Sequence, residues 1–359
     1  MNSIDTDAIK ALLRDIDDPH SGAPLGDAVE ALAISDNKAA VRIRLGYPAA
    51  GWRDALDAQI RRRLESAGIE SATIEIDWQI VEHAVQGGLA PLPGVRNIIA
   101  VASGKGGVGK STVAANLALA LQAEGARVGV LDADIYGPSQ PRLLGLSGQP
   151  ETTPERRILP MQAHGLQTIS IGVLVATDQA MIWRGPMASQ ALSQMTSETL
   201  WQDLDYLIID LPPGTGDIQL TLAQRIPVAA ALVVTTPQEI ALDDVRRAVA
   251  MFAKVKVPVL GIVENMSTHI CSNCGFEEPV FGHGGGERMA RETGLPLLGQ
   301  VPLEAAISQA TDAGTPIVVA APDSPAALRF REIARNTAAR LARQSRNTQI
   351  RMPKIKITG

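Results

Sequence analysis

Both cysteines of this 359-residue chain, Cys271 and Cys274, lie in the single stretch HICSNCGF. Thiolates three positions apart suit a metal ion or cluster, but such a site needs four ligands, so two are missing. The residues leave three interpretations open. The pair forms a redox disulfide, or His269 and His283 complete a Cys₂His₂ zinc site, or a second copy of the chain supplies two more thiolates. The two-residue spacing of His269 from Cys271 disfavours the zinc site within one chain.

A second chemical motif is GKGGVGKST, residues 104–112, which matches the phosphate-binding pattern G-x-x-x-x-G-K-[ST]. It follows the apolar stretch NIIAVAS and precedes the helix-like AANLALALQAEG. Glycines let backbone N–H groups close around a phosphate, and the helix N-terminus adds its positive end. We therefore predict ATP binding, with Lys110 on the β- and γ-phosphates and Ser111 on Mg²⁺. The predicted ATP-binding residues of the loop are Gly104, Lys105, Gly106, Gly107, Val108, Gly109, Lys110, Ser111 and Thr112.

Polar residues also end three other apolar runs. Asp132 and Asp134 end RVGVLDAD, and Asp210 ends DYLIID, where a Walker B acid would hold Mg²⁺ through its water shell. Asn265 ends VPVLGIVEN and has the donor and acceptor to contact an adenine edge, with a turn or capping role as the alternative. Because ligands bind at the carboxyl ends of parallel strands, these runs predict one shared site.

Lys105 directly follows the first glycine of the loop, and an extra lysine there is typical of the deviant Walker ATPases. In this feature the chain resembles MinD, ParA and the nitrogenase iron protein. The resemblance implies that Lys105 reaches the phosphates of a partner subunit, where a cation would stabilise developing negative charge. A solvated surface lysine is the alternative. In such a homodimer four thiolates would meet at the two-fold axis, the number that a 4Fe–4S cluster requires.

The elements that must position these residues fall into two parts. Residues 1–82 predict a small α+β domain, and 83–96, rich in Gly and Pro, predict a linker. Over 97–345, apolar strand runs alternate with helical stretches, which predicts a P-loop NTPase of the α/β class with a mostly parallel sheet covered by helices on both faces. Residues 346–359 predict a basic C-terminal tail. The small domain's predicted elements are a helix over 5–16, strands over 28–35 and 39–47, a helix over 52–67 and a strand over 71–80.

Composition limits the possible functions. The formal charge is −5 and the pI about 5.6, which argues against nucleic-acid binding. The N-terminus lacks the apolar core of a signal peptide, and no apolar run approaches the roughly 20 residues of a membrane span. Scarce cysteine fits a reducing compartment. We predict a cytoplasmic protein without stable membrane association.

Several longer blocks resemble the Mrp/ApbC family of P-loop ATPases that carry iron–sulfur clusters, over about residues 95–322. Besides the phosphate loop they are VLDADIYGPSQP, MIWRGPMASQAL, DYLIIDLPPGTGDIQLTL, TTPQEIALDDVRRAV, GIVENMS, CSNCG and FGHGGGERMA. The resemblance implies a labile cluster on Cys271 and Cys274, received from an assembly scaffold and passed to apo-proteins. It also implies slow ATP hydrolysis, because nothing resembles an arginine finger in the same chain. The implied catalytic residues are Lys105, Lys110, Asp134 and Asp210, and the implied magnesium residues are Ser111, Asp132 and Asp210.

Residues 1–82 resemble the MIP18-like domain that precedes the ATPase in many members of the family. Related domains often have a cysteine before the second helix, whereas this chain reads GYPAAGW, so this domain cannot bind a cluster through a thiol. A docking, regulatory or structural role remains. The rival function is a MinD- or ParA-like positioning switch, whose cysteines bind structural zinc and whose apolar C-terminal helix contacts a surface.

Overall fold

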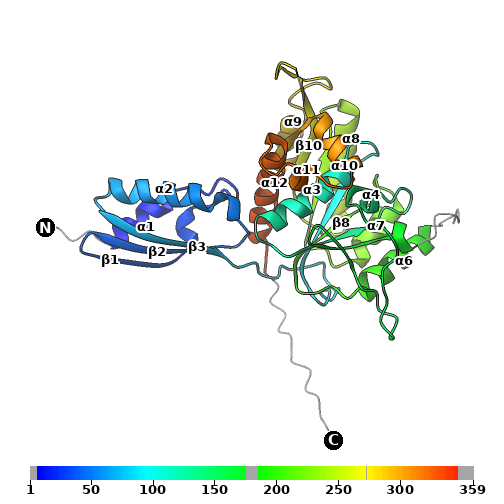
Figure 1. Ribbon diagram of the computed structural model, residues 1–359, viewed down its shortest axis with the longest axis horizontal. Coiled ribbons are helices and arrows are strands. Elements are labelled where there is room, and N and C mark those ends of the chain that lie inside the picture. Colours follow the sequence, from blue (N-terminus) through cyan, green and yellow to red (C-terminus); the bar gives the residue numbers. More distant parts are fainter. Residues whose placement is uncertain (1–5, 175–184, 272, 347–359) are drawn as a thin grey trace, which may run out of the picture.

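The computed structural model describes residues 6–174, 185–271 and 273–346 (Figure 1). The start of the predicted first helix, part of the MIWRGPMASQAL block and the predicted basic tail beyond Arg346 lie outside these ranges. In the described ranges, no helix is both long enough and apolar enough to cross a membrane.

The small domain is a three-stranded sheet with two helices, α1 (Thr6–Arg14) and α2 (Arg53–Ser66). Strand β2 (Lys38–Leu45) lies in the middle, antiparallel to β1 (Val29–Ser35) and parallel to β3 (Ser71–Trp78). Buried and exposed side chains alternate strictly along β2, as expected of a strand with one face on a core. Short 3₁₀ turns, η1 (Leu25–Ala28) and η2 (Ala50–Trp52), precede β1 and α2.

The larger domain is built on a nine-stranded sheet with the order β11-β10-β9-β4-β8-β5-β7-β6, and β12 also pairs with β10. Apolar side chains fill both faces of the central strands, which therefore lie between two helical layers. Only the β6–β7 and β10–β11 pairs are antiparallel among the described strands of this sheet. The strands are β4 (Val95–Ser103), β5 (Val128–Asp132), β6 (Met161–Ala163), β7 (Leu166–Ser170), β8 (Leu204–Asp210), β9 (Ala230–Thr235), β10 (Val259–Ile270), β11 (Glu277–Glu278) and β12 (Leu297–Leu303).

Helices cover both faces of this sheet, so the predicted α/β architecture with a mostly parallel, doubly covered sheet is confirmed (Figure 1). One layer contains α3 (Lys110–Ala123), α10 (Ala305–Asp312), α11 (Ile317–Ala320) and α12 (Pro325–Ala342). The other contains α6 (Gly185–Glu198), α7 (Asp217–Arg225), α8 (Glu239–Lys254) and α9 (Gly285–Thr293). Two short helices, α4 (Gln140–Leu143) and α5 (Ile171–Leu174), follow β5 and β7.

Strand β10 is longer than the sequence pattern predicts. The apolar run ends near Asn265, but the strand continues to Ile270 because β12 pairs with it as far as His269 and β11 folds back against its end. Neighbouring backbone therefore keeps polar residues extended that an isolated pattern would assign to a loop. As a result, Asn265 and the residue preceding Cys271 belong to one strand.

A buried carboxylate joins the two domains. Glu124, just after α3, is fully buried and accepts hydrogen bonds from Arg331 Nε and Arg335 Nη1 on α12, both at 2.8 Å. Its other oxygen accepts from the Gly51 N–H at 2.8 Å, and its carbonyl accepts from the Ala50 N–H. The small domain thus contacts both α12 and the end of the helix that begins at the phosphate loop (Figure 1).

Acidification is expected to weaken this domain contact through His20. Arg335 Nε donates to His20 Nε2 at 3.2 Å, and His20 Nδ1 lies 2.7 Å from Asn336 Oδ1, a pattern that fits neutral imidazole. Burial lowers the pKa of His20 below 6.5, with Arg335 adding to the effect and Asn336, Asp18 and Glu332 opposing it. Because the unfolded chain takes up the proton first, this contribution to stability is complete above about pH 6.5 and falls as the pH drops toward the folded pKa.

The measurement is urea denaturation of the wild type and of His20→Gln between about pH 7.5 and pH 5.5. The free energy of unfolding of the wild type should fall more steeply with acidification than that of the variant. Parallel pH profiles would contradict the assignment to His20.

Candidate functional site: a phosphate loop and a cysteine hairpin

The phosphate loop connects the buried strand β4 to the buried helix α3. Gly109 has φ of 78°, and a Cβ on it would lie 2.1 Å from Asn265 Nδ2, so only glycine fits there. A cavity of about 240 Å³ lies over the loop and is lined by Ser103, Lys105, Gly106, Gly107, Gly109, Lys110, Ser111, Thr112, Asp134, Ser139, Leu143 and Pro213. Most of the residues predicted from the loop motif therefore line one hollow at the N-terminus of α3.

Lys110 occupies the centre of the predicted catalytic group. Its ammonium forms an ion pair with Asp210, lies 3.9 Å from Asp134 Oδ2 and hydrogen-bonds Ser111 Oγ at 3.3 Å. The side chain is only 6% exposed, so these oxygens compensate for its burial. The ion pair with Asp210 thus engages the ammonium group that the sequence predicts on the phosphates.

The two acids that follow β5 differ in their surroundings. Asp132 is fully buried and accepts from Ser170 Oγ at 2.9 Å, and burial, followed by the charge of Asp210, raises its pKa to about 7. Burial also raises the pKa of Asp134, while Lys110 opposes that shift. Strongly shifted carboxyl groups beside a phosphate loop are typical of functional sites.

Asn265 lies directly against the phosphate loop. Its Nδ2 donates to the Val108 carbonyl at 2.9 Å, and the side chain is 7% exposed. In this arrangement the amide holds the loop. Through this hydrogen bond the middle of β10 contacts the phosphate loop.

Lys105 lines the same cavity. Its side chain is half-buried, and its carbonyl accepts from Ser103 Oγ at 2.9 Å. Among the described residues, no carboxylate forms an ion pair with its ammonium. This position is compatible with the contact across a dimer that the sequence predicts.

Gln140 is a residue of this site that the sequence interpretation missed. It is fully buried at the start of α4, and its Nε2 donates to Asp210 Oδ2 at 2.9 Å and to the Ser111 carbonyl at 3.0 Å. Its backbone N–H donates to Asp132 Oδ2. The only signal in the sequence is its place six residues after Asp134, in DADIYGPSQ.

The cysteines lie on a tight hairpin between β10 and β11. Cys271 N donates to the Phe276 carbonyl at 3.0 Å, Gly275 N donates to the Cys271 carbonyl at 2.8 Å, and Gly275 has φ of 71°. Both thiols are free, with Cys271 half-buried and Cys274 exposed. Hydrogen bonds from the backbone of Asn273 and Cys274, and then from the Cys274 side chain, lower the pKa of Cys271. The hairpin therefore presents accessible thiols, one with increased thiolate character.

The residues described for this chain do not complete a metal site around the thiols. Nowhere in residues 6–174, 185–271 and 273–346 do three or more His, Cys, Asp or Glu side chains gather as one metal ion would require. These residues therefore do not bring His269 and His283 together with both cysteines.

Large apolar side chains are exposed at the same edge of the sheet as the phosphate loop. Tyr136 follows β5, Ile240 follows β9, and Phe276 follows β10, with exposures of 63%, 68% and 65%. Val280, which follows the short antiparallel strand β11, is 52% exposed. Since these strands are parallel, their carboxyl ends share one edge. Exposed apolar side chains next to a binding site are typical of a protein interface.

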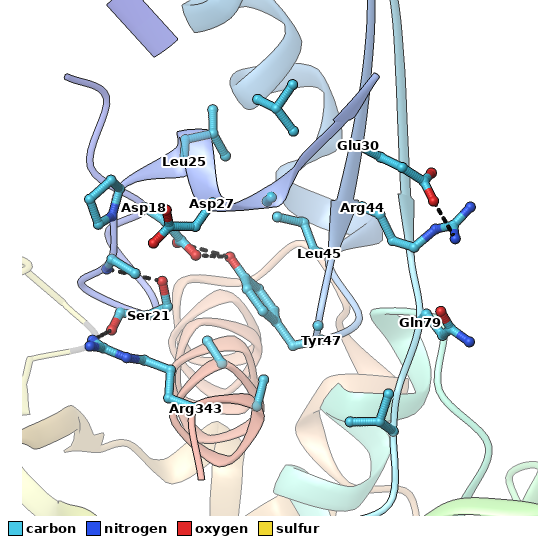
Figure 2. A pocket seen from close by; sticks show the side chains of 18 of the residues that line it. Asp18, Ser21, Leu25, Asp27, Glu30, Arg44, Leu45, Tyr47, Gln79 and Arg343 are labelled. Atoms are coloured by element: carbon cyan, nitrogen blue, oxygen red, sulfur yellow. Dashed lines mark hydrogen bonds and ion pairs between the residues drawn. The ribbon is translucent and has the colours of Figure 1, made fainter. Parts of the chain in front are cut away.

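A larger cavity, of about 410 Å³, lies at the domain junction and has none of the predicted site residues (Figure 2). Several of its polar groups are paired with one another. Both oxygens of Asp18 accept from the Tyr47 hydroxyl, Arg44 pairs with Glu30, and Arg343 donates to the Ser21 carbonyl. The residues predicted to bind nucleotide line the smaller cavity instead.

Known proteins resemble both parts of the chain. Residues 94–338 match the ParA family described as the NUBPL iron-transfer P-loop NTPase, and residues 6–76 match the family described as iron-sulfur cluster assembly protein. The iron-sulfur cluster carrier protein of Escherichia coli (strain K12) is 61% identical over 249 residues, which cover 69% of this chain and 68% of that relative. The iron-sulfur cluster carrier protein of Deinococcus radiodurans is 42% identical over 341 residues, 94% of this chain and 95% of that relative.

Solved structures share the fold of the larger domain. A nucleotide-binding protein from Archaeoglobus fulgidus in complex with ADP has a TM-score of 0.58 at 37% identity, covering 66% of this chain and 92% of that chain. The cell division ATPase MinD of Pyrococcus furiosus has a TM-score of 0.51 at 25% identity, covering 67% and 97%.

This fold, with a glycine-rich loop that leads from β4 into α3, makes the chain a P-loop NTPase. The match over residues 94–338 and the relatives of 42% identity or more narrow that class. The chain belongs to the NUBPL iron-transfer P-loop NTPase family, and the resemblance predicted from the sequence motifs is confirmed.

Proposed function

We propose that the protein is an ATP-dependent carrier that binds a labile iron–sulfur cluster on Cys271 and Cys274 and transfers it to apo-proteins. The position of the thiols is the observation that carries this proposal. They are accessible, they lack further ligands within the described chain, and they follow the strand that contacts the phosphate loop. Relatives named iron-sulfur cluster carrier protein support the same function.

Strand β10 offers a direct link between the nucleotide and the cluster. Asn265 holds the loop carbonyl of Val108, and Cys271 follows six residues later along the same backbone. A shift of the loop on ATP binding would therefore move the hairpin that bears the thiols. The loops around Asp134 and Pro212–Gly216 would change shape as the γ-phosphate leaves, which couples hydrolysis to cluster release.

The working form in this proposal is a homodimer. Two copies that meet at the edge bearing the phosphate loop would cover Tyr136, Ile240, Phe276 and Val280 and bring four thiolates together, enough for a 4Fe–4S cluster. The half-buried Lys105 would then reach the partner's nucleotide.

ATP would bind over residues 104–112 with Asn265 beside it. Lys110 would exchange Asp210 for the β- and γ-phosphates, and Asp134 would orient the attacking water. Mg²⁺ fits the oxygen-rich set of Ser111, Asp132 and Asp210, and when bound it neutralises charge that develops on the phosphates. Turnover would be slow without a cation delivered by the partner.

The proposed partners are a cluster assembly scaffold and apo iron–sulfur proteins in the cytoplasm, without nucleic acid or stable membrane association. The rival function is a MinD- or ParA-like positioning switch. The likeness to MinD concerns the fold, and a switch of that kind leaves the cysteine hairpin without a use. The apolar residues of α12 are mostly buried against the domain core, so they offer no surface anchor.

The test is anaerobic reconstitution with iron and sulfide, followed by the visible spectrum and metal analysis per dimer. We expect the wild type to hold one cluster per dimer and Cys271→Ala to hold none, because half of the thiolates would be lost. Asn273→Ala, on the same hairpin, is the matched control and should keep the cluster. Colourless wild-type protein that holds zinc would refute the carrier function.

A further inference from the structure

Gln140 is unusual for a glutamine because it is fully buried, and burial of an amide costs free energy unless its polar atoms are paired. Its orientation is fixed by its neighbours. The Asp210 carboxylate and the Ser111 carbonyl are both acceptors, so the NH₂ group must face them. The amide oxygen therefore points elsewhere, and within the described part of the chain Oε1 has no hydrogen-bond partner.

A second buried oxygen in this site also lacks a hydrogen-bond donor. Asp134 Oδ1 also lacks a donor among the described residues, while the other oxygen of Asp134 lies 3.9 Å from Lys110. Two buried acceptors without donors, on either side of the Lys110–Asp210 ion pair, call for a group that supplies hydrogens. Water molecules held by a divalent cation are such donors.

The Gln140 amide would be the remaining side-chain partner of Asp210 if Lys110 bound the phosphates. Asp210 is held by Lys110 and by Gln140. When Lys110 moves to the phosphates, Gln140 remains, and the same NH₂ group also binds the carbonyl of Ser111. Gln140 thus fixes the spacing between two predicted magnesium residues.

We propose that Gln140 is a positioning residue for the magnesium-bound nucleotide. Its NH₂ group holds Asp210 and Ser111 in register once Lys110 has left, and its Oε1 accepts a hydrogen bond from a magnesium-bound water. This assignment rests on the proposed ATP chemistry and adds a residue whose role concerns the cation more than the phosphates.

The test compares the wild type with Gln140→Met, which keeps the length of the side chain but has no amide. A fluorescent ATP analogue is titrated first with EDTA present and then at rising Mg²⁺. Affinity in EDTA should change less than about twofold, whereas the Mg²⁺ concentration at half-maximal binding should rise about tenfold, the effect of losing hydrogen bonds to charged groups. Gln167→Met, whose amide bonds the Gln202 carbonyl far from the cavity, is the matched control.

Gln140→Asn is the second variant, because it keeps the amide and shortens the side chain. This variant should fold even if Gln140→Met does not. Its Mg²⁺ concentration at half-maximal binding should also be higher than that of the wild type. An unchanged Mg²⁺ midpoint in a folded variant, or equal losses with and without Mg²⁺, would overturn the assignment. Wild-type protein that bound no nucleotide would instead refute the proposed function.

Discussion

Changing Lys105 to alanine is expected to lower the rate of ATP hydrolysis by about 10³-fold while ATP binding to the single subunit changes by less than about threefold. Lys105 is half-buried in the cavity wall, whereas Lys110 is only 6% exposed and is paired with Asp210. A cation that arrives only in the closed dimer stabilises the transition state and not the ground state. Steady-state hydrolysis and nucleotide titration measure the two effects separately. Lys254→Ala, at the exposed end of α8, is the control and should behave as the wild type.

Mixing Lys105→Ala with Lys110→Ala shows from which subunit the lysine acts. The first variant binds ATP but supplies no lysine to its partner, and the second supplies Lys105 but binds no ATP. In an equal mixture, about half of all dimers contain one subunit of each variant, and each of these dimers has one intact site of two. About a quarter of the wild-type rate should therefore return. A mixture as inactive as its components would show that Lys105 acts within its own chain or not at all.

Changing Glu124 to alanine is expected to lower the free energy of unfolding by about 3–5 kcal/mol, because removal of one partner leaves buried charges uncompensated. Arg331 and Arg335, whose side chains are only 19% and 14% exposed, would lose their carboxylate, and the Gly51 N–H would lose its acceptor. The small domain should separate more often, and proteolysis should become faster in the segment 83–96. Urea denaturation and limited proteolysis measure the two effects.

Glu332→Ala is the matched control on α12, since its ion pair with Arg329 is exposed and contributes at most about 1 kcal/mol. Equal stability of Glu124→Ala and Glu332→Ala would show that the buried carboxylate does not hold the domains together.

The sequence predicts features that depend on short, local patterns. The phosphate loop, the apolar strands and the acids at their ends are each contained in about ten residues, and parallel pairing then brings the strand ends together. The fold class follows from these patterns, and the family follows from the resemblance of longer blocks of sequence. The cysteine hairpin is also predicted as a loop near the nucleotide, although the length of β10 is not.

The features that the sequence does not predict depend on tertiary contacts. Strand β12 contains Gly299, Gln300 and Pro302, which interrupt its apolar run, so only pairing with β10 identifies it. Gln140 reads as an ordinary loop residue until the fold places Asp210 beside it. Glu124 reads as a solvated helix end, and its arginines lie more than two hundred residues later in the chain.

Helix α3 extends from Lys110 to Ala123, which makes it about 21 Å long at 1.5 Å per residue. One end begins at the nucleotide cavity, and the residue after the other end binds the backbone of the small domain. Its middle is packed between the sheet and α12, and this close packing resists bending of the helix. Helix α3 is therefore a direct connection from the phosphate loop to a domain that has no cysteine of its own, and a movement of the loop along this helix would also move that domain. The position of the small domain would then depend on the nucleotide state, and a protein that binds this domain would be sensitive to that state.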